Sequence, residues 1–503
     1  MELLRKQLLE IAHLSSAYTL MAWDMETSMP KGGAKMRGDA MAYLYVSVHN
    51  NIIALNKDRL LDMLKQEANK QKSKLSHDEK IIVNETYRSY KNEVCLPEAF
   101  VKEYSLHKSE AHHIWVEARK KSNFKLFEPA LKKMVDLKRK QAQYIGYKDS
   151  PYDALLDQYE PGLTSQELTV LFDDLKDFLV PFIREIKKSK KKMAKFKATD
   201  RFPKTEQVAL NHLVCGKLGF DFNHGEIRES AHPFSLSLNP DDVRFTTRYD
   251  EKNMKDSFFS TIHELGHAFY EKGILSEHYG TPFGEYISLG IHESQSRFWE
   301  NVVARSPEFA KFVFPYLKQA FPKVFAKRTP QDFFEIASTV MPGFIRVESD
   351  EVTYNMHIIV RFEIEKELIE GSIEAKDVPK IWKDKMKTYL GLDVKKDSLG
   401  ALQDVHWSGG MMGYFPTYTL GNLYSLQFWN AMKKDIKDAE RKIAKGDFTP
   451  LLSWLKEKIH MHGKRYTASA LVKQVTGEEL TSAYFINYLK EKYGKIYGFK
   501  PGK

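Results

Sequence analysis

The chain has 503 residues, of which 42% are hydrophobic and 29% charged, and its formal net charge is +10. This composition is typical of a globular protein and excludes a disordered or fibrous chain. Over this length the positive charge is mild, so a solvated lysine-rich surface is favoured over a nucleic-acid-binding one. The two cysteines form no CxxC pair and cannot build a disulfide framework, which fits a reducing compartment.

The first 200 residues are dominated by helical patterning. Apolar residues recur at helical spacing from the start of the chain, at Leu3, Leu4, Leu8, Leu9, Ile11 and Leu14. Charged residues interrupt this first segment, so it does not resemble a signal peptide. No run in the chain approaches 18 apolar residues, so no membrane span is predicted. We therefore expect a cytoplasmic protein that binds neither membranes nor nucleic acid.

The pattern changes between residues 200 and 255. Three runs there, FDFNHGEI, HPFSLSL and VRFTTRYD, alternate aromatic or β-branched residues with polar ones. This alternation predicts a short antiparallel sheet. Helical patterning then resumes up to the C-terminus. We expect a mainly α-helical protein that forms one unit over residues 1–503, with an N-terminal helical lobe of about 1–200 and a second lobe of about 201–503.

The run HELGH at residues 263–267 is the clearest chemical motif. His263 and His267 are four residues apart, so a helix places both imidazoles on one face, where they can bind one zinc ion. Glu264 is angled away from ligation, but it can hold a metal-bound water and take its proton as a general base. Zinc lowers the pKa of that water toward about 7, which gives a nucleophile at neutral pH. The alternative is a pair of structural histidines on a helix.

A catalytic zinc ion needs a third protein ligand and keeps a fourth position for water. The run SLGIHESQSRFWENVV has helical spacing, and a loop through residues 280–284 can return it to the first two ligands. Glu293 is the candidate third ligand. His292 is its competitor, about 100° around the same helix. The alternative for Glu293 is a surface carboxylate.

Several motifs in a fixed order resemble the carboxypeptidase Taq family of thermostable metallocarboxypeptidases, which are HELGH gluzincin-type metallopeptidases. The matching runs extend over nearly the whole chain: LMAWDMETSMPKGGAKMRG, PYDALLDQYEPG, HPFSLSL, DDVRFTT, HELGH, HESQS, IRVESDEVTYNMH, GALQDVHWSGGMMGYFPTYTLGN and IHMHGKRYTASALVKQVTG. Ser349 stands where the family usually has alanine. The resemblance implies a neurolysin-like helical fold around a deep groove, with the small sheet next to the active site.

The same resemblance implies a function. It implies a homodimeric exopeptidase of broad specificity that releases C-terminal amino acids from peptides. The family's metal ligands correspond to His263, His267 and Glu293, and its general base corresponds to Glu264. This agrees with the interpretation made from the residues alone.

Substrate binding calls for further polar side chains. A carboxypeptidase must recognise a free α-carboxylate, and the planar fork of arginine pairs with a carboxylate through two hydrogen bonds. Arg346 and Arg244 are the candidates, and such arginines would also close one end of the groove to longer chains. The alternative is that each arginine pairs only with the acidic residues next to it in the sequence.

Hydrolysis also develops negative charge on the scissile carbonyl, which a hydroxyl or imidazole donor can stabilise. Tyr414 and Tyr418 lie in a glycine-rich run, and by analogy with neurolysin-like enzymes Tyr418 is the favoured donor. His406 and His232 are candidates for binding the peptide backbone, although either could be a core histidine.

Carboxylates are also expected to fix the tautomers of the ligating histidines, and the candidates are Glu348, Asp350 and Glu351 on one helical stretch. His460 and His462 point apart on a helix and are interpreted as structural. Two other functions remain open: a zinc endo-oligopeptidase or dipeptidase, and a non-catalytic basic helical protein that binds RNA or a protein partner. Zinc is the default metal, and Co²⁺ or Mn²⁺ can substitute in the same ligand set.

Overall fold

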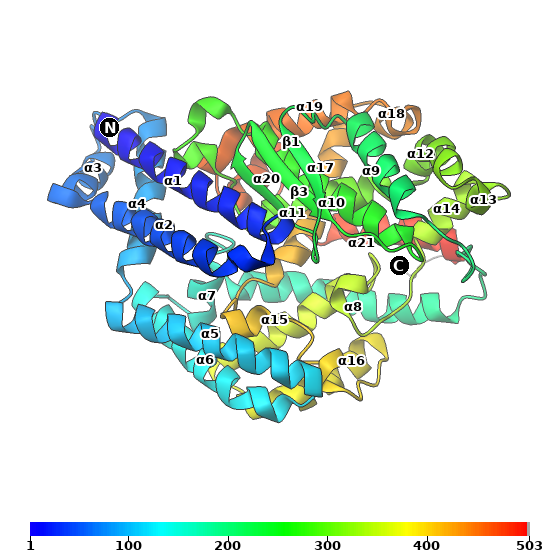
Figure 1. Ribbon diagram of the computed structural model, residues 1–503, viewed down its shortest axis with the longest axis horizontal. Helices are drawn as coiled ribbons and strands as arrows, with labels where there is room; N and C mark the ends of the chain where they lie inside the picture. The colour runs from blue at the N-terminus through cyan, green and yellow to red at the C-terminus, as the bar shows by residue number, and fades with distance from the viewer. Residues whose placement is uncertain (500–503) are drawn as a thin grey trace.

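The computed structural model describes residues 1–499 and shows a mainly helical protein with one small sheet (Figure 1). The helices before the sheet are α1 (Glu2–Thr27), α2 (Ala34–Ala54), α3 (Leu60–Ala68), α4 (His77–Val94), α5 (Glu98–Lys121), α6 (Phe124–Ile145), α7 (Pro151–Leu156), α8 (Ser165–Lys188) and α9 (Lys204–Leu218). The predicted fold class is therefore confirmed. None of the helices described combines the length and the apolar composition that crossing a membrane requires.

The sheet is formed by β1 (Gly225–Glu229), β2 (Ser235–Asn239) and β3 (Asp242–Thr247), in the order β1-β3-β2. Strands β2 and β3 are antiparallel, but β1 runs parallel to β3. The sheet is therefore mixed, and the prediction of a wholly antiparallel sheet was wrong. Alternation identifies a strand but not its partner. Here the chain leaves β1, forms β2 on the far side of β3 and then turns back into the central strand.

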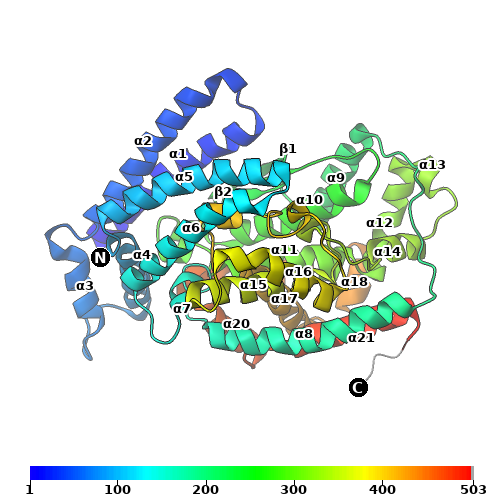
Figure 2. The same ribbon diagram turned by 90° about the horizontal axis from the view of Figure 1, so that it is seen from below.

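The remaining helices follow the sheet in the sequence. They are α10 (Met254–Gly273), α11 (Leu289–Arg297), α12 (Pro307–Ala320), α13 (Pro322–Phe325), α14 (Pro330–Ala337), α15 (Tyr354–Glu370), α16 (Val378–Leu390), α17 (Pro416–Asp435), α18 (Ala439–Lys445), α19 (Thr449–Lys458), α20 (Ala468–Thr476) and α21 (Ala483–Tyr497). A π-helical segment, Phe298–Ala304, continues directly from α11. Helices α8 and α21 are distant in the sequence and lie side by side (Figure 2), where the Ser189 hydroxyl donates to the Tyr497 carbonyl.

Two hydrophobic cores hold these elements together. The larger core contains buried residues from α5 through α21, so it draws on both sides of residue 200. A smaller core joins α1, α3 and α4 through Leu4, Leu61 and Val83. The division into two lobes at about residue 200 stays a prediction. Helix α1 also packs on the sheet (Figure 1), where the Trp23 indole donates to Glu226 and its ring meets Phe234 edge to face.

Helix α11 is held tightly between α10 and α17 by two glycines. A Cβ on Gly266 of α10 would lie 2.5 Å from the Gln295 carbonyl oxygen, and one on Gly421 of α17 would lie 2.4 Å from Glu293 Cγ. Any larger residue would therefore push α11 away from its neighbours. Gly266 thus allows the backbone of α11 to approach α10 closely. The start of α11 is fixed by Ser288, whose hydroxyl accepts from the Ile291 amide.

Candidate active site

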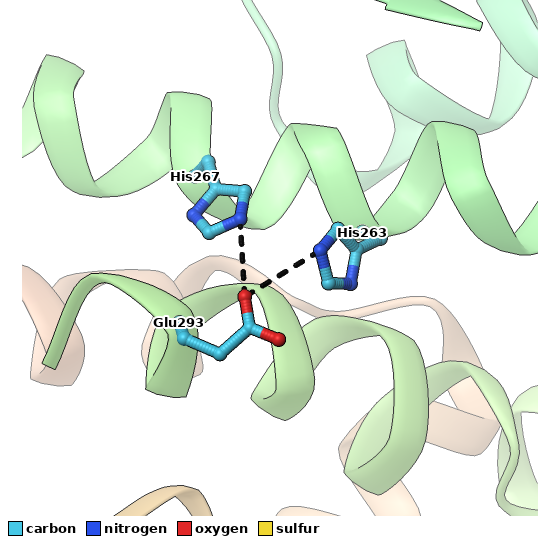
Figure 3. A group of neighbouring side chains, drawn as sticks. All are labelled: His263, His267 and Glu293. Atoms are coloured by element: carbon cyan, nitrogen blue, oxygen red, sulfur yellow. Dashed lines mark ion pairs between the residues drawn. The ribbon is translucent and has the colours of Figure 1, made fainter. Parts of the chain in front are cut away.

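Three side chains predicted to bind metal converge between α10 and α11 (Figure 3). Glu293 Oε2 lies 3.6 Å from His263 Nε2 and 3.4 Å from His267 Nε2. One nitrogen of each histidine and one Glu293 oxygen all lie within 4.8 Å of one another. The helix α10 can present the two histidines because its opposite side is apolar, with Phe258, Ile262, Leu265 and Phe269 in the main core.

Glu300, in the π-helical segment, contacts the other nitrogen of His263. Its Oε2 lies 3.0 Å from His263 Nδ1, and it also accepts from Arg297 and Arg305. Glu300 comes seven residues after Glu293, so helical spacing already places both carboxylates on one face of the chain. Glu300 was not among the predicted site residues, and its spacing from Glu293 was the pattern that could have revealed it.

The carboxylates predicted to fix the histidine tautomers contact other groups instead. Glu351 accepts from Lys492 and Tyr493, and Asp350 accepts from backbone amides, among them that of Val352. Glu348 is exposed at the end of a short 3₁₀ turn, so the three do not share one helical stretch. That prediction was wrong because burial and long-range packing, which local spacing does not report, decide where each carboxylate points.

His292 does not face the space between the proposed ligands. Its Nδ1 lies 2.6 Å from His267 Nδ1, and its Nε2 lies 2.9 Å from Glu271 Oε1. The competing role of His292 as a ligand therefore gains no support from the geometry. His460 is also accounted for as a structural residue, because it is fully buried and its Nε2 contacts Gln295.

The electrostatic environment differs among these groups. Burial raises the pKa of Glu264 to about 7. Burial also lowers the pKa of His267 to about 3, and the adjacent His292 adds to this effect. Burial alone would lower the pKa of His263, but Glu293 and Glu300 outweigh it and raise that pKa. Glu293 is buried as well, yet Arg297 and His263 hold its pKa below the usual range.

A groove of about 770 Å³ opens onto these side chains. One wall is α1, which contributes small and apolar side chains such as Leu8, Ile11 and Ser15, and another is β2. Glu264, Tyr414 and Tyr418 line the groove together with His263, His267 and Glu293. A deep groove beside the sheet was expected from the family resemblance, and the structure contains one.

Arg346 lies behind the groove rather than on its surface. It is 6% exposed, and its guanidinium stacks on the Tyr418 ring at 4.8 Å. It donates from Nε to Asp404 at 3.1 Å and from Nη1 to the Tyr354 hydroxyl at 3.0 Å. The acidic residues adjacent in sequence are thus not its partners. Asp404 also accepts from Arg361, so two buried arginines share one carboxylate.

The other three candidates for substrate binding are not among the side chains that line the groove. Arg244 donates to Asp242 through two bonds of 2.7 Å and stacks over Trp23, which matches the alternative of a structural ion pair. His232 is exposed before β2. His406 packs on Phe415 with ring centroids 4.5 Å apart, and burial lowers its pKa to about 4. Their roles in substrate binding stay predictions.

The helical fold, the groove and the HELGH helix together define a metallopeptidase. A model of the family described as "Carboxypeptidase Taq (M32) metallopeptidase" matches residues 3–493. Carboxypeptidase 1 of Bacillus subtilis is 40% identical over 487 residues, which cover 97% of this chain and 96% of that protein. Thermostable carboxypeptidase 1 of Pyrococcus furiosus is 39% identical over 482 residues, which cover 95% of each chain.

The fold agrees with these sequence matches. The crystal structure of the M32 carboxypeptidase from Deinococcus radiodurans R1 superposes with a TM-score of 0.95 at 34% identity, covering 99% of each chain. The chain belongs to the carboxypeptidase Taq (M32) family of metallopeptidases. It is therefore a metallocarboxypeptidase, and the predicted family and enzyme class are both confirmed.

Proposed function

We propose that the protein releases single amino acids from the C-terminus of peptides with broad side-chain specificity, using a zinc ion held by His263, His267 and Glu293. The observation that carries this proposal is the convergence of two imidazole nitrogens and one carboxylate oxygen within 4.8 Å. Two nitrogens and an oxygen form a common ligand set of catalytic zinc. Co²⁺ or Mn²⁺ would suit the same donors.

The donor atoms fit a divalent ion. Both Nδ1 atoms are occupied by other partners, Glu300 for His263 and His292 for His267, so both Nε2 atoms remain for a metal. When bound, such an ion acts as a Lewis acid that activates water and polarises the scissile carbonyl. The negative charge of Glu293, held ionised by Arg297, suits it to a cation.

Glu264 is proposed as the general base. It lies in the groove wall, and its burial raises its pKa to about 7, so near neutral pH it can take a proton from the attacking water and return it to the leaving amine. The Tyr418 hydroxyl is proposed to donate to the oxygen of the scissile carbonyl as its negative charge develops, and Tyr414, whose ring lies 5.4 Å from that of Tyr418, to bind the peptide beside it.

Arg346 is proposed to attract the free α-carboxylate of the substrate. Arg346 and Arg361 carry two positive charges and share the single negative charge of Asp404. These three groups therefore carry a net positive charge behind the groove residue Tyr418. A buried excess of positive charge is costly, so an incoming carboxylate is favoured there.

The first test is mass spectrometry of an N-blocked octapeptide incubated with the pure protein, with and without a chelator. The expected product is a ladder of peptides that lose single residues from the C-terminus. Chelation should abolish the ladder, and added zinc or cobalt should restore it. Internal cleavage would indicate an endo-oligopeptidase instead. Absence of cleavage with every added metal would contradict the proposal.

We also propose that the protein acts as a homodimer in the cytoplasm. The homodimer is implied by the family resemblance, and the two free cysteines, Cys95 and Cys215, suit a reducing compartment. Light scattering of the pure protein should give about twice the mass of one chain if the dimer forms, and a monomer mass would contradict this part of the proposal.

A further inference from the structure

The two histidines of the proposed metal centre are held by unlike partners. His263 Nδ1 reaches the carboxylate of Glu300 directly, at 3.0 Å. His267 Nδ1 meets a second imidazole, His292 Nδ1, at 2.6 Å, and only the far nitrogen of His292 reaches a carboxylate, Glu271, at 2.9 Å. Glu271 follows His267 by four residues on α10, whereas His292 comes from α11 and lies between them.

The donor and acceptor properties of these groups fix the direction of the hydrogen bonds that run from His267 through His292 to Glu271. An ionised carboxylate only accepts, so His292 Nε2 must carry a hydrogen and donate it to Glu271. In a neutral His292, Nδ1 is then an acceptor, and the hydrogen between the two rings belongs to His267 Nδ1. His267 is thereby left with a lone pair on Nε2, the atom that faces Glu293.

Packing holds the ring of His292 in the plane that these two hydrogen bonds require. Its ring lies beside that of His267 in a similar plane, with centroids 4.5 Å apart and an interplanar angle of 28°. Tyr286 meets the ring at 4.9 Å and Tyr270 meets it at 5.3 Å. These contacts fix the plane of the ring, and the hydrogen bonds choose between its two orientations, because a 180° turn would place carbon atoms where both nitrogens now meet their partners.

We propose that Glu271 and His292 are positioning residues of the metal centre, which hold His267 in the Nδ1–H tautomer and aim its Nε2 at the ion. This inference rests on the proposed metal-binding role of His267. Its consequence is an unequal pair of ligands. His263 is polarised by a full carboxylate, whereas His267 is polarised only through a neutral ring and is the weaker donor.

The test compares two replacements of His292 that differ in hydrogen bonding. In His292→Asn, the side-chain oxygen takes the place of Nδ1 and can still accept from His267. In His292→Phe, the ring and its packing remain but both nitrogens are lost. The readouts are the zinc dissociation constant, measured by competition with a chromophoric chelator, and the visible absorption spectrum of the Co²⁺-loaded protein. Glu277→Gln, which changes a 75% exposed carboxylate six residues after Glu271 in the sequence, is the control.

The expected result is that His292→Phe weakens zinc binding about 10- to 100-fold and alters the cobalt spectrum. His292→Asn should stay closer to wild type on both readouts, and Glu277→Gln should match wild type. A residue that only fills space would give the opposite order, because phenylalanine preserves the ring and asparagine does not. Wild-type affinity in His292→Phe, or a larger loss in His292→Asn, would overturn the proposal.

Two further measurements keep the test decisive. If His292→Phe does not fold, Glu271→Gln is the second variant, and it should release zinc to a chelator faster than wild type. An unchanged release rate in Glu271→Gln would overturn the inference. The proposed metal centre is checked separately, because wild type should bind one ion and His263→Ala should lose it. If those two behave as expected while His292→Phe matches wild type, only the positioning role fails.

Discussion

Two groups of largely buried charged side chains lie next to the groove, and they differ in charge balance. In the first, which we call the ligand cluster, two carboxylates face two arginines, and its members are Glu293, Glu300, Arg297 and Arg305. In the second, which we call the anion cluster, two arginines face one carboxylate, and its members are Arg346, Arg361 and Asp404. The first is balanced within the protein, whereas the second has an excess positive charge.

This difference in charge balance indicates whether each cluster favours binding of a cation or of an anion. The ligand cluster can be buried without a substrate because each carboxylate already has a guanidinium partner, and its Glu293 lies beside the imidazoles of His263 and His267, where a cation can bind. The anion cluster carries an unmet positive charge, so a substrate carboxylate improves its balance. Tyr354 joins the two clusters, because Arg297 stacks over its ring at 4.4 Å and Arg346 donates to its hydroxyl.

The largest expected effect comes from the proposed base beside the ligand cluster. Glu264→Gln keeps the size of the side chain but removes its ability to take a proton. We expect kcat to fall by about 10²- to 10⁴-fold, with metal content unchanged. Steady-state kinetics and metal analysis of the same preparation measure both quantities. Normal hydrolysis by this variant would show that Glu264 is not the base, and loss of the metal would show that it acts as a ligand.

The next effect is expected in the anion cluster. Arg346→Ala removes half of its positive charge, and because a charged hydrogen bond contributes about 1.5–3 kcal/mol, kcat/KM for a peptide with a free C-terminus should fall about 10- to 100-fold. The same peptide as a C-terminal amide should be cleaved poorly by wild type and variant alike. Arg346→Lys, which keeps the charge but not the fork, should lie between them. Equal kinetics of wild type and Arg346→Ala on the free acid would exclude this arginine as the anchor.

A smaller effect concerns pH and stability. The pKa of His406 is lowered to about 4 by burial, an effect that the charges of Arg346 and Arg361 strengthen and that of Asp404 opposes. Below its usual pKa of about 6.5, the unfolded chain binds a proton at His406 that the folded chain does not bind, so stability falls as pH drops from there toward 4. By about pH 5 the loss is about 2 kcal/mol.

His406→Gln cannot take this proton. Urea unfolding of the metal-free protein should therefore show that the variant gains stability relative to wild type between about pH 7 and about pH 5. His232→Gln, which changes an exposed histidine, is the matched control and should track wild type at both values. A difference between His406→Gln and wild type that does not change with pH would mean that the pKa of His406 is not lowered in the folded protein.

Local spacing explains why the residues proposed to bind the metal were predictable from the sequence. The four-residue interval of His263 and His267 places both imidazoles on one face of α10, as predicted. The role of Glu300 was also accessible through its interval from Glu293. Asp404 was not, because it meets Arg346 from 58 residues away along the chain, and no periodicity relates the two. The direction of β1 was missed for the same reason, since strand pairing depends on the path of the chain between strands.

The link between the two clusters gives the smallest expected effect. Tyr354→Phe keeps the ring under Arg297 and removes only the hydroxyl that accepts from Arg346. The cost of one charged hydrogen bond predicts a roughly tenfold loss in kcat/KM for peptides with a free C-terminus. Zinc affinity should not change, because the contacts of Glu293 and Glu300 are intact. A loss of zinc affinity in this variant would mean that the two clusters are coupled. A loss of kcat/KM confined to peptides with a free C-terminus would confirm that the two clusters act separately, one on the metal and one on the substrate carboxylate.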